Sequence, residues 1–276
     1  MPVPSADTFA ALARSSPWRW STLRFTVSWP GDRYRAGPVR AWLRRPDLLR
    51  VETLDGGLLQ VVRETRPAVA VLDPDGGSRV EVSWGRGPEP ALRPDGLVDR
   101  RPDRRSEGSW TSFDAPMYQD YRWIAMLDPV ELADGIDRDT GGTVPALVVD
   151  DVTEVEHAGR PAWEALVRTT PAYEPRCGCC PLLRSRYIDL LEYSDHPENV
   201  LEHYPEAYRV RLDVGTGVCV FTDEIGVRSP GGSHDLRIEA VDEPMADALF
   251  VAPSRPPTTG WAPVETAVPG LAPPSQ

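Results

Sequence analysis

The sequence predicts a mainly β protein of the α+β class, with about ten or more strands in one antiparallel sheet and a few helices. The clearest observation is the segment 208–250, which begins with apolar residues alternating with charged ones over 208–213, as in a half-buried strand. A turn over 213–217 contains two glycines, and two further strand-like runs follow it. A block of short strands near the N-terminus and a helical pair in mid-chain complete the pattern.

The N-terminal third begins with a predicted helix over 1–16, capped by Ser5 and ended by Pro17. Six strands are expected between Trp20 and Trp84, each joined to the next by a short turn. Their apolar alternation places them at 23–29, 39–43, 49–53, 58–63, 68–72 and 79–84. Consecutive strands joined by short turns are usually neighbours in space, so we expect an antiparallel meander.

The middle of the chain changes character. Segment 85–107 is rich in Pro, Gly, Arg and Asp without periodicity, which predicts a flexible loop. Met117 and Tyr121 then begin a helical spacing. Asp128 is expected to cap a second short helix over 130–133.

Strands resume in the last third. A hairpin is predicted over 148–169, an irregular tip that holds three cysteines over 170–183, and a strand over 184–193. The proline-rich tail 253–276 cannot bury enough apolar area to order itself, so we expect disorder there. A single β domain is expected over 17–252.

Composition limits the partners. The chain has 276 residues and a net charge of -12, which disfavours nucleic acid and anionic membrane surfaces. It contains no lysine, which excludes a P-loop and Schiff-base chemistry. The use of arginine alone, with abundant Pro, Ala and Gly, indicates a GC-rich genome such as those of actinobacteria.

Localisation is predicted from two absences in the sequence. The N-terminal segment lacks the apolar core of a secretory signal, and no run of about 18 apolar residues could span a membrane. We therefore expect a cytoplasmic protein with reduced cysteines, or an exported one if the N-terminus is incomplete.

Three short motifs carry a family resemblance. In chain order they are P-x-x-x-R-x-E at Pro46, Arg50 and Glu52, D-x-x-T-G at Asp213, Thr216 and Gly217, and a closing turn and helix over 242–250. With the order of elements between Trp20 and Phe250, they resemble the LolA-like lipoprotein-carrier superfamily, which is related to RseB- and LppX-type proteins. The resemblance implies a curved half-barrel sheet wrapped over helices, with an apolar cavity for lipid or lipidated chains. The chain departs from that pattern in lacking an export signal, in its 85–107 loop and in its cysteine-rich tip.

No catalytic motif is recognisable. Ser233, His234 and Asp235 have the residue types of a triad, but consecutive residues cannot converge as nucleophile, base and orienter. Nucleophile-elbow, dinucleotide-binding and zinc-protease signatures are missing. We therefore predict a protein that is not an enzyme and has no catalytic residue and no organic cofactor.

The cysteines are the sharpest local signal. Cys177 and Cys180 have the C-x2-C spacing of structural zinc sites, with Cys179 between them and Cys219 farther along. Zinc is the cofactor that these four residues suggest. The alternative is a hairpin tip with free thiols, and Cys219 as a small buried hydrophobe.

Large aromatic and apolar residues give the other candidate site. Core packing explains them most simply, and lining a ligand cavity is the alternative. The candidate cavity residues are Trp29, Trp42, Met117, Tyr121, Trp123 and Trp163.

The function predicted from these observations is non-enzymatic binding of an apolar or lipid-like ligand in the concavity of a half-barrel. One alternative is a protein-interaction or regulatory module that uses the same scaffold without a small ligand. Another is a zinc- or thiol-dependent site at the cysteine tip.

Overall fold

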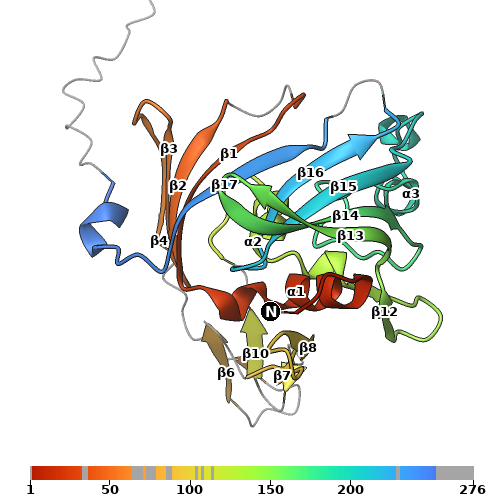
Figure 1. Ribbon diagram of the computed structural model, residues 1–276, viewed down its shortest axis with the longest axis horizontal. Helices are drawn as coiled ribbons and strands as arrows, with labels where there is room; N and C mark the ends of the chain where they lie inside the picture. The colour runs from red at the N-terminus through yellow and green to blue at the C-terminus, as the bar shows by residue number, and fades with distance from the viewer. Residues whose placement is uncertain are drawn as a thin grey trace, which may run out of the picture.

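The computed structural model describes residues 2–32, 37–63, 71–72, 79–84, 89–102, 105–106, 109–112, 115–227 and 231–252. Nine strands form one curved antiparallel sheet in the order β13-β14-β15-β16-β17-β1-β2-β3-β4 (Figure 1). They are β1 (Thr22–Ser28), β2 (Val39–Arg44), β3 (Leu48–Thr53), β4 (Leu58–Arg63), β13 (Leu147–His157), β14 (Arg160–Thr169), β15 (Ala207–Asp213), β16 (Cys219–Ile225) and β17 (His234–Val241). The predicted fold class is confirmed, and the predicted tail 253–276 lies outside the described residues.

The sheet joins two meanders that are far apart in sequence. Strands β1–β4 follow one another, as do β13–β17, and the two blocks meet where β1 pairs with β17. Leu23 lies opposite Val241, and Val27 lies opposite Leu236. The concave face takes the alternate apolar residues of both blocks, since their side chains point to one side of each strand.

Two helices fill the concavity. Helix α1 (Ala6–Arg19) begins at Ser5, whose Oγ accepts from the Thr8 backbone N–H at 3.2 Å. Helix α2 (Tyr121–Leu127) is capped by Asp120 and followed by the short helix η1 (Val130–Leu132). Side chains from α1, α2 and the strands form one continuous buried cluster. Pro17 does not end α1 as expected, because in the last turn it removes only one backbone hydrogen bond.

A second group of strands lies on the far side of α1 from the large sheet (Figure 1). Strands β5 (Val71–Leu72), β6 (Arg79–Trp84), β10 (Ser109–Ser112) and β9 (Arg105–Ser106) form a separate sheet. The prediction of one continuous meander is therefore wrong between β4 and β5, although β5 and β6 pair antiparallel as expected. On its other side β6 pairs in parallel with β10.

The described part of the predicted loop 85–107 contains a hairpin. Strands β7 (Ala91–Leu92) and β8 (Val98–Arg100) pair, and Leu97 and Val98 are buried against α1. The Val98 N–H donates to Ser15 Oγ at 2.8 Å. Local contacts with α1 therefore give this segment a defined structure that its composition does not indicate.

The segment predicted as a strand over 184–193 is a helix, α3 (Arg186–Glu192). Ser185 caps it, with its Oγ accepting from the Ile188 N–H at 3.2 Å. The preceding tip has no strand or helix, and a short helix η2 (Pro197–Asn199) follows. A small hairpin of β11 (Asp134–Ile136) and β12 (Thr143–Pro145) precedes β13.

The convex face is also covered near β2 and β3. Trp42 packs there with Leu48 and Phe250, and the short helix η3 (Asp247–Phe250) lies over them. Arg44 donates to the Met245 carbonyl at 2.6 Å, which ties this closing segment to the sheet. Covering the outer face explains why Trp42 points away from the main core without being exposed.

The β15–β16 turn fastens the sheet to α1. Asp213 accepts from both Thr216 groups, at 2.7 Å for the backbone N–H and 2.8 Å for Oγ1, and from Arg160 Nε at 2.7 Å. Gly217 has φ 73, and a Cβ built there would lie 2.7 Å from the Leu12 carbonyl oxygen. Only glycine allows this turn to approach the helix backbone.

We predict that Gly217→Ala lowers the free energy of unfolding by about 3 kcal/mol, because the new Cβ meets both a left-handed backbone and the backbone of α1. Gly159→Ala is the matched control, since Gly159 has φ 79 and open space around its Cβ position. It should cost only about 1 kcal/mol. Urea denaturation of both variants measures the difference, and equal losses would show that the helix contact does not matter.

Candidate functional site

The cysteine tip and helix α3 lie together at one end of the sheet, and buried polar groups position both. Asp128 follows α2 and is 1% exposed. Arg176 donates to its carboxylate at 2.5 Å, and Arg101 forms a two-pronged ion pair with it. Burial opposes ionisation, but Arg101 and Arg176 together outweigh it and hold the pKa of Asp128 well below its usual range. Asp128 therefore joins distant segments, and Pro129, not Asp128 as expected, is the N-cap residue of η1.

Glu131 holds the two ends of the thiol-bearing loop. Its Oε2 accepts from the Arg176 backbone N–H at 3.3 Å, immediately before the cysteines. Its Oε1 accepts from the Leu182 N–H at 3.0 Å, just after them, and from the Tyr173 hydroxyl at 2.5 Å. Burial and the Glu131 carboxylate raise the pKa of Tyr173, so this hydroxyl stays a donor. The loop is irregular, yet it is anchored at both ends.

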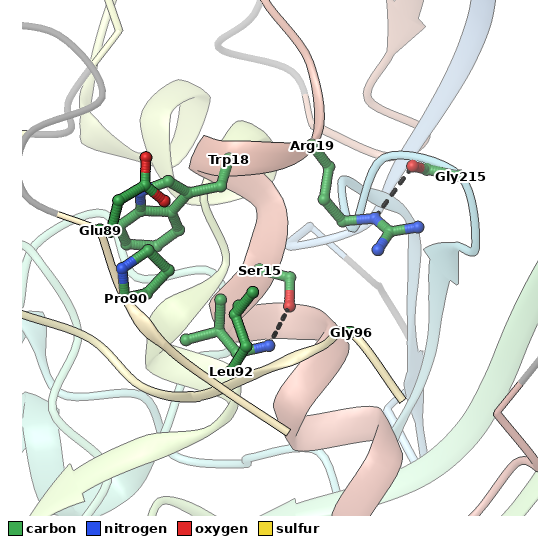
Figure 2. Close-up of a pocket in the computed structure, with 9 residues that line it drawn as sticks. Ser15, Trp18, Arg19, Glu89, Pro90, Leu92, Gly96 and Gly215 are labelled. Carbon is green, nitrogen blue, oxygen red and sulfur yellow. Dashed lines mark hydrogen bonds between the residues drawn. The ribbon is translucent and has the colours of Figure 1, made fainter. Parts of the chain in front are cut away.

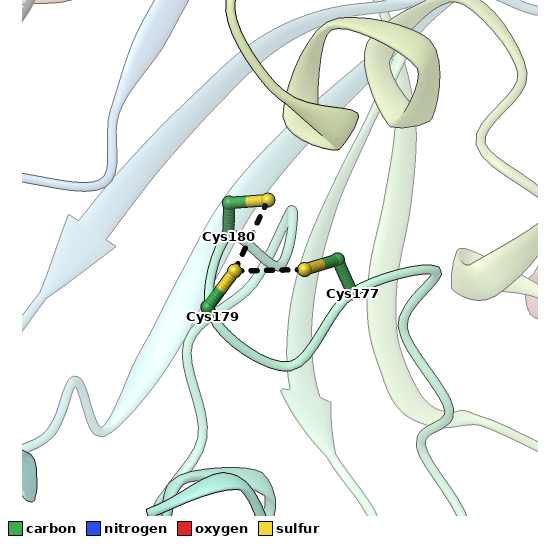
Figure 3. Close-up of side chains that lie close together, drawn as sticks. All are labelled: Cys177, Cys179 and Cys180. Atoms are coloured by element: carbon green, nitrogen blue, oxygen red, sulfur yellow. Dashed lines mark hydrogen bonds between the residues drawn. The ribbon is translucent and has the colours of Figure 1, made fainter.

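Three thiols converge on this loop (Figure 3). The sulfur atoms of Cys177, Cys179 and Cys180 all lie within 4.8 Å of one another. Cys177 and Cys179 are 2.8 Å apart, and Cys179 and Cys180 are 3.8 Å apart. Cys179 is exposed and the other two are half-buried, so solvent reaches the group.

The three thiols have different affinities for their protons. Burial opposes ionisation of Cys177, but hydrogen bonds from Cys179 and Cys180 outweigh it and lower the pKa of Cys177. The hydrogen bond to Cys177, together with burial, raises the pKa of Cys179. Burial and the adjacent Cys177 raise the pKa of Cys180. Cys177 is therefore the first of the three thiols to ionise as the pH rises.

Cys219 is not a member of this group. It lies on β16 within the main core, and burial raises the pKa of its thiol to about 12. Its place on the inward face of a strand explains why it packs with the core. It behaves as the small hydrophobe of the alternative interpretation.

Helix α3 is held firmly on its inner side. Asp189 is fully buried, and its carboxylate accepts from Arg184 Nε at 2.9 Å and from the Tyr204 hydroxyl at 2.7 Å. Tyr204 in turn accepts from the Leu201 N–H at 3.0 Å. Burial and Asp189 raise the pKa of Tyr204 to about 12. The helix and the segment after it are therefore fixed relative to each other.

The outer side of α3 is apolar. Tyr187, Leu190 and Leu191 occupy positions i, i+3 and i+4 and are 39%, 50% and 50% exposed. Leu201, on the tethered segment, is 43% exposed. We call Tyr187, Leu190, Leu191 and Leu201 the α3 face. Sequence analysis missed it because the segment was assigned to a strand, although this spacing is a helical signal.

The six candidate cavity residues do not share one place. Trp29, Trp123 and Trp163 are buried in the main core, and Met117 packs against it. Trp42 is on the convex side, and Tyr121 is 44% exposed. Phe25 and Tyr118 stack around Trp123 with ring centroids 5.2 and 5.3 Å away. That these residues line a ligand cavity stays a prediction.

A surface pocket of about 350 Å³ lies elsewhere, between α1, the β7–β8 hairpin and Gly215 (Figure 2). Trp18 and Glu89 line it with Arg19. The Arg19 guanidinium donates to the Gly215 and Val214 carbonyls, each at 3.0 Å, and burial lowers its pKa. The Arg19 cation is committed to the protein backbone, so it is not available to a ligand in the pocket.

The described residues therefore define an open, curved antiparallel sheet with helices in its concavity. No protein-family model matches the chain, and no curated protein matches its sequence. Among solved structures it is similar to MucB, at 15% identity and a TM-score of 0.38 over 90% of this chain and 63% of that one. It is also similar to MucB in complex with MucA(peri), at 13% identity and TM-score 0.36 over 91% of this chain and 60% of that one.

The complex structure of Pseudomonas aeruginosa MucA/MucB is a third similar structure, at 14% identity and TM-score 0.37 over 90% of this chain and 61% of that one. The chain thus spans about three fifths of the length of these proteins. Such a distant likeness does not carry the activity or the partner of MucB over to it. None of the helices that the structure describes has both the length and the apolar character to cross a bilayer.

Replacing Asp128 by Asn should lower the free energy of unfolding at pH 7 by about 3–5 kcal/mol, because two buried arginines lose their counter-charge. The folded pKa of Asp128 is depressed, so its contribution is complete above the unfolded pKa and is lost as the pH falls below about 4. Asp128→Asn should therefore lose less stability than the parent chain as the pH falls from 7 to 2. Denaturation midpoints between pH 7 and pH 2 measure both effects.

Asp150→Asn is the control, since Asp150 pairs with Arg168 at 2.7 Å on the surface. It should change stability by less than about 1 kcal/mol. An equal effect of the two substitutions would mean that burial of the Asp128 ion pair is unimportant.

Proposed function

We propose that this protein is a non-enzymatic protein-binding scaffold that docks a basic, amphipathic segment of a partner protein on the α3 face. The observation that carries the proposal is a rigid helix whose outward positions i, i+3 and i+4 are all large and apolar. A surface helix normally places polar residues there. Exposed apolar groups of this kind, rimmed by polar residues, mark interaction sites.

The inner side of α3 supports this assignment. Ile188 and Asp189 are buried and Ile188 belongs to the main core, so the helix already has a side that packs inward. The outward leucines are therefore not required for folding. Covering each half-exposed leucine would contribute about 1 kcal/mol, which fits a reversible contact.

The charge around the α3 face selects the partner. Five exposed acidic residues lie on or after the helix, against two exposed arginines, Arg186 on the helix and Arg138 over the Tyr187 ring. The acids are Glu192, Asp195, Glu198, Glu202 and Glu206. A partner segment with leucine-like residues flanked by Arg or Lys complements both the apolar and the acidic parts.

A cation already contacts this face. Arg138 lies over the Tyr187 ring at 5.3 Å from its centroid, and Arg138 also pairs with Glu174 at 2.8 Å. The ring thus accepts a guanidinium at one side. A second copy of the chain fits less well, since its own net charge of -12 would repel the acidic rim.

The test uses fluorescence anisotropy with the full chain and a labelled helical peptide that carries Leu at i, i+3 and i+7 flanked by Arg. We expect saturable binding that weakens as salt is raised. The double variant Leu190→Gln, Leu191→Gln should bind at least tenfold more weakly, with an unchanged melting temperature. Leu54→Gln is the control, because Leu54 is 49% exposed in the turn between β3 and β4.

Three outcomes would contradict the proposal. A peptide with Glu in place of Arg could bind equally well, or the double variant could bind like the parent chain. Concentration-dependent dimerisation that the double variant abolishes would assign the face to a second copy. Saturable binding of a fluorescent fatty acid, unaffected by the double variant, would instead support the apolar ligand predicted from the sequence.

A further inference from the structure

We propose that Cys177, Cys179 and Cys180 form a binding site for one zinc ion, with Glu192 as the fourth ligand. This site is separate from the docking function proposed for the α3 face, although both involve α3. The proposal stands on three converging sulfur atoms, a carboxylate that lies over Gly178 between two of the cysteines, and backbone contacts that hold the loop in shape.

The sulfur geometry is close to that of a tetrahedral zinc site. With Zn–S bonds of about 2.3 Å, two thiolate ligands lie about 3.8 Å apart. The Cys179–Cys180 distance is 3.8 Å, and the Cys177–Cys179 distance of 2.8 Å would have to open by about 1 Å. Rotation of one exposed side chain provides that movement.

The fourth ligand would come from α3, after rotation of the Glu192 side chain, since Glu192 itself lies outside the group of three mutually close thiols. A Cβ built at Gly178 would lie 2.4 Å from Glu192 Oε2, so this carboxylate lies directly over the residue between Cys177 and Cys179. Its negative charge also acts on the Cys179 thiol. Three thiolates and one carboxylate suit a borderline-soft divalent ion better than Cu(I), which prefers sulfur alone.

The loop around the site is preorganised. Glu131 accepts backbone N–H groups on either side of the cysteine run, from Arg176 and Leu182. Arg122 donates to the Pro181 carbonyl at 3.3 Å, next to Cys180. A site that is already shaped spends less of its binding free energy on ordering the chain.

Binding must release protons. Three Zn–S bonds form, and each thiol that was still protonated gives its proton to solvent. Because protons are released, zinc affinity should rise as the pH rises. If the cysteines had only a structural role, the chain would bind no zinc at any pH.

The experiment titrates the reduced full chain with zinc chloride against a chromophoric chelator, and with Co(II) to read thiolate ligation in the visible spectrum. We expect one ion per chain and a thiolate-to-cobalt charge-transfer band. Cys177→Ser and Cys179→Ser should each weaken zinc binding at least 100-fold. Glu192→Gln should weaken it about tenfold, with the band retained.

Two matched controls separate ligation from general effects. Cys219→Ala removes the buried thiol and should leave the stoichiometry unchanged. Glu198→Gln removes an exposed carboxylate from the following segment and should leave the affinity unchanged. Circular dichroism confirms that each variant is folded.

Several results would overturn the proposal. These are a stoichiometry far below one, equal binding by the parent chain and Cys177→Ser, or binding of Cu(I) without binding of zinc. A Cys177–Cys179 disulfide whose reduced form still takes up no zinc would assign the tip to redox chemistry. The peptide-docking assay on Cys177→Ser tells the two proposals apart, since docking should persist when zinc binding is lost.

Discussion

Two buried carboxylates, on Asp128 and Glu131, hold the candidate site together. A charge removed from water is costly unless it is paired and hydrogen-bonded. Asp128 meets this requirement with Arg101 and Arg176, and Glu131 meets it with Tyr173 and two backbone N–H groups. The cost of leaving either unpaired forces segments that are distant in sequence to converge on one short turn after α2.

This arrangement explains why an irregular loop can carry a defined site. The tip has no strand or helix to give it shape, yet the buried acids fix its start and its end. Helix α3 is fixed in the same way by Asp189. Glu192 ends the helix and extends over Gly178, so the thiol group and the α3 face share one rigid support while presenting different chemistry.

The sequence indicated the sheet well, because the alternation of apolar and polar residues is a direct consequence of strand geometry. The sequence indicated only in part which thiols lie together. C-x2-C spacing suggested a metal site, but nothing in the pattern could separate Cys219, whose burial depends on the inward face of β16. Asp128 was expected to be a cap because it precedes a proline, and its two arginine partners lie 27 and 48 residues away.

The α3 segment shows a different limit. Its apolar residues fit a short strand as well as a helix, and the short length made the two hard to separate. The segment forms a helix because Ser185 caps it and because the buried Asp189 carboxylate is hydrogen-bonded to Arg184 and Tyr204. Tertiary contacts of this kind override local preference.

The pairing of β1 with β17 has a consequence for the order in which the protein is made. Strand β1 leaves the ribosome early, whereas its partner is complete only when residue 241 has been synthesised. Until then the β1 edge has no partner on that side, and the apolar side chains of β1–β4 cannot be fully covered. Pairing that spans more than 200 residues is slow to form. The first half of the sheet is therefore prone to aggregation during synthesis. Chaperones and the rate of translation should both affect the yield of folded protein.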